Sequence, residues 1–323
     1  MEKLLHRRDA LLDMATSYLD VGSHVQSTSW QVVVMLYTLF FTMHGKDATE
    51  NEHAMHLVCP REIQQRCASV FASEMHALIP AFHENATSNA SRKTTIAMLE
   101  PSLLSLHLYL CSMTSTFVAA LQVGAFSVSH ASAMLQYYAQ FGHDYDTMCH
   151  EVISVLRDDA LHSERDWLVA ETIVETLKGS FAVFSLYGDD VMEAHYIALA
   201  RQLANATMVR GPGFTVLESL NGSAMVTLHV AAIQQFIQYM QDSDNDEKTP
   251  VFFKGLSQLL TTLKPADAMT VHSTMHQRLA AAQIEPVSGA KAWDAFFSYD
   301  KRLLNVAAKD DSIVKEAQHY SAA

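Results

Sequence analysis

Apolar side chains recur at helical spacing along most of this chain. Between residues 163 and 185 the large apolar residues are separated by three, four or seven positions, which places them on one face of a helix. They are Trp167, Val174, Leu177, Phe181 and Phe184. Segment 251–263 repeats this pattern with Phe252, Leu256, Leu259, Leu260 and Leu263. Both segments are therefore expected to be helices with one buried face.

Similar stretches predict ten further helices, and no alternating strand pattern competes with them. They cover about 3–20, 26–44, 61–80, 101–123, 128–140, 145–157, 191–208, 222–241, 265–286 and 289–306. Ser163, three residues before Asp166, is a candidate N-cap for the helix in 163–185. Pro265 suits the first position of the helix that is expected to end near Pro286.

The links between these helices are short and polar, which makes consecutive helices antiparallel neighbours. The sequence has only 11 Gly and 7 Pro, few for folds that need many tight turns. We therefore expect an all-α fold, an α-solenoid of HEAT-like antiparallel helical hairpins. Residues 1–323 would form a single repeat domain, with 289–306 as the last helix and 307–323 as a loose tail. An irregular helical bundle is the alternative.

The composition narrows the class of function. The 323 residues include 22 basic and 35 acidic side chains, a net charge of −13 at pH 7, which argues against a protein that grips phosphate backbones by bulk charge. Four cysteines without a C-x-x-C pair, and an N-terminus without an apolar signal region, indicate an intracellular, reduced protein. The longest apolar stretch, 30–43, is shorter than the roughly 18 residues of a membrane span, so no membrane is expected as a partner.

The charge is unevenly distributed. Residues 1–100 carry 8 basic and 11 acidic side chains, residues 101–200 carry 3 and 12, and residues 201–323 carry 11 and 12. An acidic middle third would attract a basic segment of a partner, although most acidic helix faces are only solvated.

Two adjacent aromatic residues, Tyr137 and Tyr138, lie within the predicted helix 128–140. Neighbouring positions cannot share one helical stripe, so one of the two rings is exposed unless a neighbouring repeat or a partner covers it. Both explanations stay open from the sequence.

Two histidine pairs, His53/His56 and His272/His276, have spacings that put both rings on one helix face, as in many metal sites. Neither pair has the Glu of an H-E-x-x-H motif, and neither has a third ligand nearby in the sequence. The sequence therefore predicts no metal site and no other cofactor.

Motifs for catalysis are missing from the sequence as well. There is no G-x-S-x-G and no P-loop, and Gly211-Pro212-Gly213 is followed by Val216 where a dinucleotide motif needs its third glycine. We therefore expect neither an enzyme nor a small-molecule substrate. The alternative is a helical enzyme built from scattered residues, for instance His229 with an acidic neighbour.

Five parts of the chain between residues 135 and 304 carry motifs in a recognisable order. They are LQYYAQFGHDYDTMCHEVI at 135–153, AETIVETLKGSFAVF at 170–184, ALARQLANATMVRG at 198–211 with MVTLHVAAIQQFI at 225–237, FFKGLSQLLTTLKPADAMTV at 252–271, and WDAFFSYDKRLL at 293–304. In this order they resemble the C-terminal third of the stromalin (SA-type) subunit of cohesin. The single matches are Arg201, Leu228, His229, Ile233, Asp267, Trp293, Tyr299, Arg302 and Leu303. Gln202 and Ala295 depart from the family's pattern.

The resemblance implies a non-enzymatic HEAT-like scaffold that corresponds to the C-terminal part of a longer family architecture. Its partner would be the kleisin subunit of cohesin and, through kleisin, the SMC subunits. Contact with chromatin or DNA would be indirect for so acidic a chain. The protein would be nuclear and chromosome-associated, and would support sister-chromatid cohesion.

A disordered kleisin segment would fold as helices along the surface of the solenoid. We expect it to contact Tyr137, Tyr138, Asp144 and Asp146, with Arg201 and Arg210 as charge partners further along. The alternative function is another helical-repeat adaptor, such as a transport or trafficking scaffold.

Overall fold

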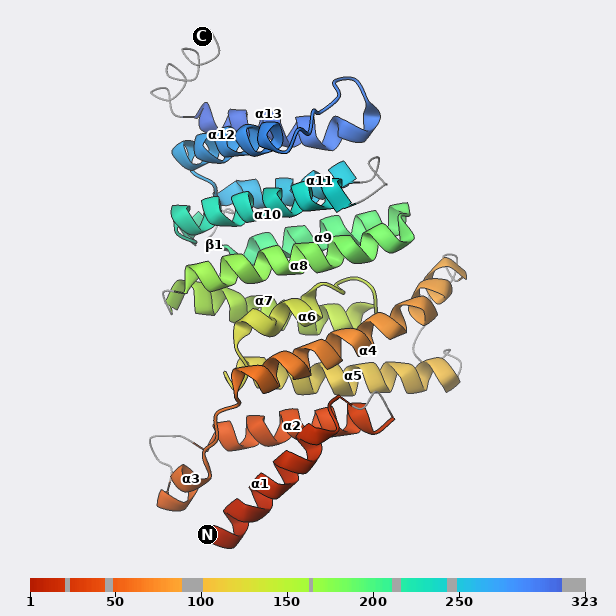
Figure 1. The fold of residues 1–323 in the computed structure, drawn as a ribbon, viewed down its shortest axis with the longest axis vertical. Coiled ribbons are helices and arrows are strands. Elements are labelled where there is room, and N and C mark those ends of the chain that lie inside the picture. Colours follow the sequence, from red (N-terminus) through yellow and green to blue (C-terminus); the bar gives the residue numbers. More distant parts are fainter. Residues whose placement is uncertain are drawn as a thin grey trace. The chain divides into compact units, whose positions relative to one another are not determined.

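The computed structural model describes residues 1–20, 24–43, 49–88, 101–162, 165–210, 216–242 and 249–309. These residues are almost entirely helical, which confirms the expected all-α fold of packed helices (Figure 1). The chain divides into two compact units, residues 1–155 and 156–323, with the boundary inside one helix. The single repeat domain expected from the sequence stays a prediction.

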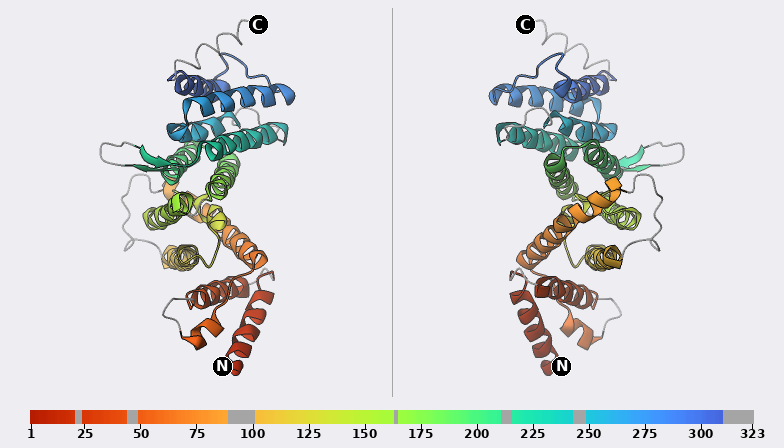
Figure 2. Two further views of the ribbon diagram at one scale, coloured as in Figure 1. Left: turned by 90° about the vertical axis from the view of Figure 1, so that its left-hand side faces the viewer. Right: turned by 90° about the vertical axis from the view of Figure 1, so that its right-hand side faces the viewer.

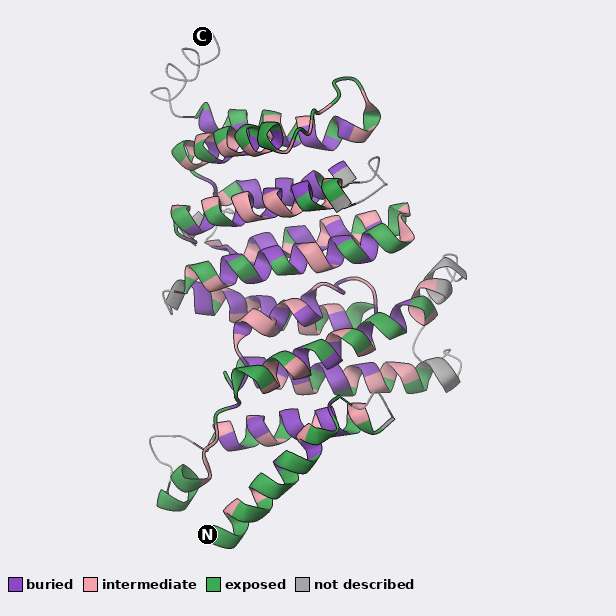
Figure 3. Ribbon diagram, in the orientation of Figure 1, coloured by how far each residue is buried: buried purple, intermediate pink, exposed green. Residues whose placement is uncertain are grey.

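Unit 1 is built on helix α2, which lies against α1, α4 and α5. Its helices are α1 (Glu2–Ser17), α2 (His24–Phe41), α3 (Glu50–Met55), α4 (Arg61–Ser88), α5 (Pro101–Gln122), the 3-10 turn η2 (Val128–Ala131), α6 (Ser132–Leu135) and the first part of α7 (His143–His162). Most of α1 is exposed, and the residues that α1 buries are Leu12 and Ala15 (Figure 3).

An aromatic cluster forms the core of unit 1. Trp30 of α2 is fully buried, and its Nε1 donates a hydrogen bond to the carbonyl oxygen of Cys67 at 2.7 Å. The rings of Phe71 on α4 and Phe117 on α5 stack with their centroids 4.6 Å apart, and the two centroids lie 5.8 and 6.2 Å from that of Trp30. This cluster holds α2, α4 and α5 together and so fixes the position of α5 beside α2.

Unit 2 consists of three helical hairpins of about 40 residues each, the length typical of a HEAT unit. They are α8 (Asp166–Tyr187) with α9 (Asp190–Ala206), α10 (Gly222–Asp242) with α11 (Phe252–Leu256) and its 3-10 continuation η5 (Ser257–Thr262), and α12 (Pro265–Ala281) with α13 (Asp294–Ala307). Short 3-10 turns, η4 (Thr249–Val251) and η6 (Lys291–Trp293), precede α11 and α13. Helices α8, α10 and α12 lie side by side in one layer, and α9, α11 and α13 in the other (Figure 2).

Aromatic side chains also fill the core between the first two hairpins of unit 2. Phe181, Tyr196 and Phe252 are buried, and the hydroxyl of Tyr196 donates to the carbonyl oxygen of Phe252 at 2.9 Å. Gly255 allows α11 to approach this ring, because a Cβ at that position would lie 2.5 Å from Tyr196. The apolar residues expected to face the core in 251–263 are all buried.

A short β-hairpin replaces the simple link between α9 and α10. Strand β1 (Met208–Arg210) pairs antiparallel with β2 (Val216–Ser219), and an irregularity lies between Val209 and Arg210. The sequence predicted no strand, so this part of the prediction is wrong. The three-residue and four-residue strands are too short to show a clear alternation of polar and apolar positions.

Other boundaries also differ from those expected. Segment 128–140 is not one helix but η2, α6 and a series of turns, and α3 was not predicted. Residues 251–263 tighten into a 3-10 helix after Leu256. The last helix begins at Asp294 rather than 289, and residues 310–323 of the expected tail lie outside the described residues.

The start of α8 also differs from the expectation. The helix begins at Asp166 after Arg165 as N-cap, while Ser163 lies outside the described residues. Trp167, expected in the core, is 62% exposed and lies in the first turn of α8, next to the polar residues Asn221 and Ser223. The expected start of α12 at Pro265 is confirmed.

Candidate protein-binding surface

Both tyrosines of the predicted partner site are buried inside unit 1. The hydroxyl of Tyr137 donates to the carbonyl oxygen of Ala72 on α4 at 2.8 Å. The hydroxyl of Tyr138 forms a hydrogen bond of 3.3 Å with Nε2 of His150 on α7. Neighbouring helices cover the two rings, so neither ring offers a surface to a partner. Packing within the fold explains this aromatic pair.

The two aspartates of the same segment have different surroundings. The carboxylate of Asp144 is about half exposed and lies 3.2 Å from Nε2 of His107 on α5. Asp146 accepts a hydrogen bond of 2.8 Å from the backbone amide of Ala139, a residue with a φ of 66°. Burial raises the pKa of Asp146 above its usual range. Asp146 thus stabilises the strained turn before α7, and Asp144 is the more exposed of the two.

The predicted arginines lie in unit 2, away from those residues in the sequence. Arg201 of α9 is exposed, and its Nε donates to Oε1 of Gln258 at 3.4 Å. Arg210 ends strand β1, and its side chain lies outside the part of the chain that the structure describes. Because Tyr137 and Tyr138 are buried in unit 1, the six predicted residues do not form one exposed surface.

His229, the candidate for an enzyme built from scattered residues, lies in the core of unit 2. Its Nδ1 is 2.8 Å from the hydroxyl of Tyr299 on α13, and both side chains are fully buried. Burial lowers the pKa of His229 to about 4, so the imidazole is neutral at physiological pH. This geometry is that of a hydrogen bond inside the core, and no described acidic side chain is hydrogen-bonded to the ring.

A different surface of unit 1 stands out by its lack of charge. Helices α2 and α5 contain no Asp, Glu, Lys or Arg over their 18 and 22 residues. The two helices lie side by side and run in the same direction (Figure 1). Near the middle of both helices Nε2 of Gln31 donates to Oγ of Ser112 at 3.2 Å, and further along the helices enclose a groove between Leu39 and Ala119.

The groove between α2 and α5 has a volume of about 470 Å³. Met35 and Leu39 line it from α2 and are 60% and 51% exposed. Leu108, at the other end of the α5 surface, is 62% exposed. Large apolar side chains exposed in a row are unusual on a protein surface and mark interaction sites.

Four hydroxyl-bearing residues also line this groove: Thr38, Thr42, Ser115 and Thr116. Each hydroxyl donates to a carbonyl oxygen of its own helix, three or four residues earlier, at distances of 2.7 to 3.1 Å. These donors are already satisfied, so the threonines can present their methyl groups to a ligand. The groove is therefore less polar than its composition suggests.

Sequence reasoning missed this groove because it treated 26–44 and 101–123 only as core helices. The signal was present, since residues 101–143 contain no charged side chain at all. All twelve acidic residues of the middle third therefore follow position 143. The partner surface was predicted from the acidic residues, whereas the exposed apolar residues lie elsewhere.

The same composition makes residues 104–122 of α5 long and apolar enough to cross a membrane. The buried side of this helix, with Leu110, Met113 and Phe117, packs in the core of unit 1. A core helix of a soluble protein passes the same test, so the length and composition of α5 do not by themselves indicate a membrane span.

No protein-family model, no curated protein and no solved structure matches this chain. The motifs shared with the stromalin family therefore stay a resemblance.

Proposed function

We propose that this protein is a non-enzymatic helical scaffold whose groove between α2 and α5 binds a helical segment of a partner protein. The observation that carries the proposal is the exposure of Met35 and Leu39 on a surface without charged residues. The centres of protein interfaces are poor in charged residues and rich in methionine and aromatic residues. An amphipathic helix binds such a groove by inserting apolar side chains at helical spacing.

The resemblance to stromalins specifies the first partner to test, the kleisin subunit of cohesin. On this proposal the chain acts in the nucleus on chromosomes, reaches the SMC subunits through kleisin and contacts DNA only indirectly. Stacked helical hairpins of about 40 residues support the proposal, because HEAT-like scaffolds hold extended partners in this way.

The test measures binding of the purified chain to the central segment of a kleisin by titration calorimetry. We expect binding that the double variant Met35→Glu/Leu39→Glu weakens by at least about tenfold, because two buried carboxylates would lose their hydration. The matched control is Leu186→Glu on α8, which introduces the same charge at a leucine that is 68% exposed. This control should bind as the wild-type chain does.

Three results would contradict the proposal. A correctly folded wild-type chain that does not bind the segment would remove kleisin as the partner. Equal binding by the wild-type chain and the double variant would remove the groove as the site. Binding to lipid vesicles that the double variant abolishes, without binding to the segment, would assign the apolar surface to a membrane.

A further inference from the structure

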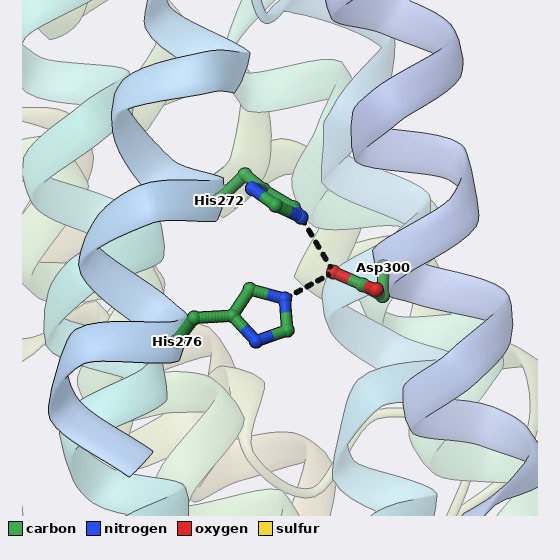
Figure 4. Close-up of side chains that lie close together, drawn as sticks. All are labelled: His272, His276 and Asp300. Atoms are coloured by element: carbon green, nitrogen blue, oxygen red, sulfur yellow. Dashed lines mark hydrogen bonds and ion pairs between the residues drawn. The ribbon is translucent and has the colours of Figure 1, made fainter. Parts of the chain in front are cut away.

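Three side chains with metal-binding atoms converge on the last hairpin of unit 2. His272 and His276 lie one turn apart on α12, and Asp300 projects towards them from α13 (Figure 4). Nε2 of His272 is 3.2 Å from Oδ1 of Asp300, and Nε2 of His276 is 2.9 Å from the same oxygen. The three ligand atoms all lie within 4.8 Å of one another.

These separations are close to those around a bound zinc ion. Zinc lies about 2.0 to 2.2 Å from imidazole nitrogen and carboxylate oxygen, so neighbouring ligand atoms in a tetrahedral site are roughly 3.3 Å apart. The two nitrogen–oxygen distances in the hairpin differ from this spacing by only a few tenths of an ångström. Small rotations of the side chains would therefore place the three atoms around one ion.

The chemistry of the three groups suits a divalent transition metal. Neutral imidazole binds zinc and its neighbours in the first transition row, and one carboxylate supplies negative charge. An aspartate carboxylate is ordinarily ionised at physiological pH, so Asp300 can supply that charge.

An ion can reach the three side chains from solvent. The side chains of His272 and Asp300 are about one fifth exposed, and that of His276 is nearly half exposed. His276 also lines a cavity of about 550 Å³ at the end of α12, next to Leu279 and Gln283. Water can therefore complete the coordination of an ion held by the three residues.

We propose that His272, His276 and Asp300 bind one zinc-type divalent ion, which ties α12 to α13. Such an ion would link two helices that contact each other along their length and would stabilise the C-terminal hairpin. The site is independent of the groove in unit 1, since no residue is common to both.

The experiment uses the full chain, freed of metal with a chelator and titrated with Zn²⁺ alone in a calorimeter. We expect one ion per chain and a higher unfolding temperature in the presence of Zn²⁺. Two variants, His272→Gln/His276→Gln and Asp300→Asn, are measured separately, so that misfolding of one leaves the other informative. Each should weaken Zn²⁺ binding by at least about tenfold, as the loss of a metal ligand or its support does.

The matched control is His53→Gln/His56→Gln, which removes the other closely spaced histidine pair from α3 and its C-cap. It should bind Zn²⁺ as the wild-type chain does. Co²⁺ provides a second readout, because its visible absorption reports the coordination and should change in the two site variants alone. Absence of Zn²⁺ binding at micromolar concentrations, or wild-type binding by both site variants, would overturn the proposal.

Discussion

At the scale of single residues, His229 and Tyr299 form a hydrogen bond of 2.8 Å that is fully enclosed by unit 2. An imidazole without access to water resists protonation, because the charged form would lose its hydration. The imidazole of His229 is therefore neutral in the folded chain, and its protonation at low pH favours unfolding.

This burial predicts a specific dependence of stability on pH. The pKa of His229 is about 4 in the folded chain, whereas that of a solvent-exposed histidine is about 6.5. The unfolded chain therefore binds a proton first, so stability is lost as pH falls from about 6.5 to about 4, by up to about 3 kcal/mol. Urea unfolding of the wild-type chain and of His229→Gln should show a steeper loss for the wild type in this range.

Comparing the pH dependence of stability in the wild type and in His229→Gln separates the contribution of His229 from those of the other titrating groups. His276 contributes with the opposite sign, because its hydrogen bond to Asp300 raises its pKa and this stabilisation is lost as pH rises. Identical pH dependence of the wild type and His229→Gln would show that His229 is not protected from water.

Gly255 is a position where an added Cβ atom would disturb the packing of the core. A Cβ there would lie 2.5 Å from the ring of Tyr196, which is buried and cannot move freely. We expect Gly255→Ala to lower the free energy of unfolding by about 1 to 3 kcal/mol, the cost typical of overpacking a core. Urea denaturation measures it, with the exposed Thr261→Ala as a control that should change the free energy little. Equal stability of Gly255→Ala and wild type would contradict the close approach of α11 to α9.

At the scale of helices and strands, the long elements could be predicted and the short ones could not. The apolar spacing in 222–241 predicted the helix α10 there because long amphipathic stretches carry many repeats of the pattern. Helix α3 is too short for that, although Thr49 and Glu52 form a capping box that marks its start. The strands β1 and β2 have no comparable signal.

The candidate sites depend on pairs of elements, which is why the sequence did not reveal them. Asp300 lies 24 residues after His276, and only the pairing of α12 with α13 brings the two together. The inward hydrogen bonds of the hydroxyls on α2 and α5 are equally invisible in the sequence. Turns between α6 and α7 place the rings of Tyr137 and Tyr138 in the core, which the sequence had left open.

The lack of charge on α2 and α5 predicts how partner binding responds to salt. Attraction between charged surfaces weakens strongly as salt screens it, whereas apolar contacts do not. The affinity of the kleisin segment should therefore change by less than about threefold between low and physiological salt. Calorimetry at the two ionic strengths measures this. A much larger fall in affinity would assign binding to the acidic residues that begin with Asp144 instead.

At the scale of the whole molecule, the chain is a set of helical hairpins with two compact units and little irregular structure among its described residues. The uncharged surface of α2 and α5 belongs to unit 1, and the convergent metal-binding residues belong to unit 2. Such a division suits a scaffold, in which separate hairpins serve separate contacts.

Hydrogen–deuterium exchange of the full chain, with and without the kleisin segment, tests whether a partner helix binds in the groove of unit 1. A helix bound between α2 and α5 would bury their exposed side and slow the opening of their backbone hydrogen bonds. We expect added protection in residues 24–41 and 101–122, with little change in α9 or α13. Protection confined to other helices, or none despite binding, would contradict it.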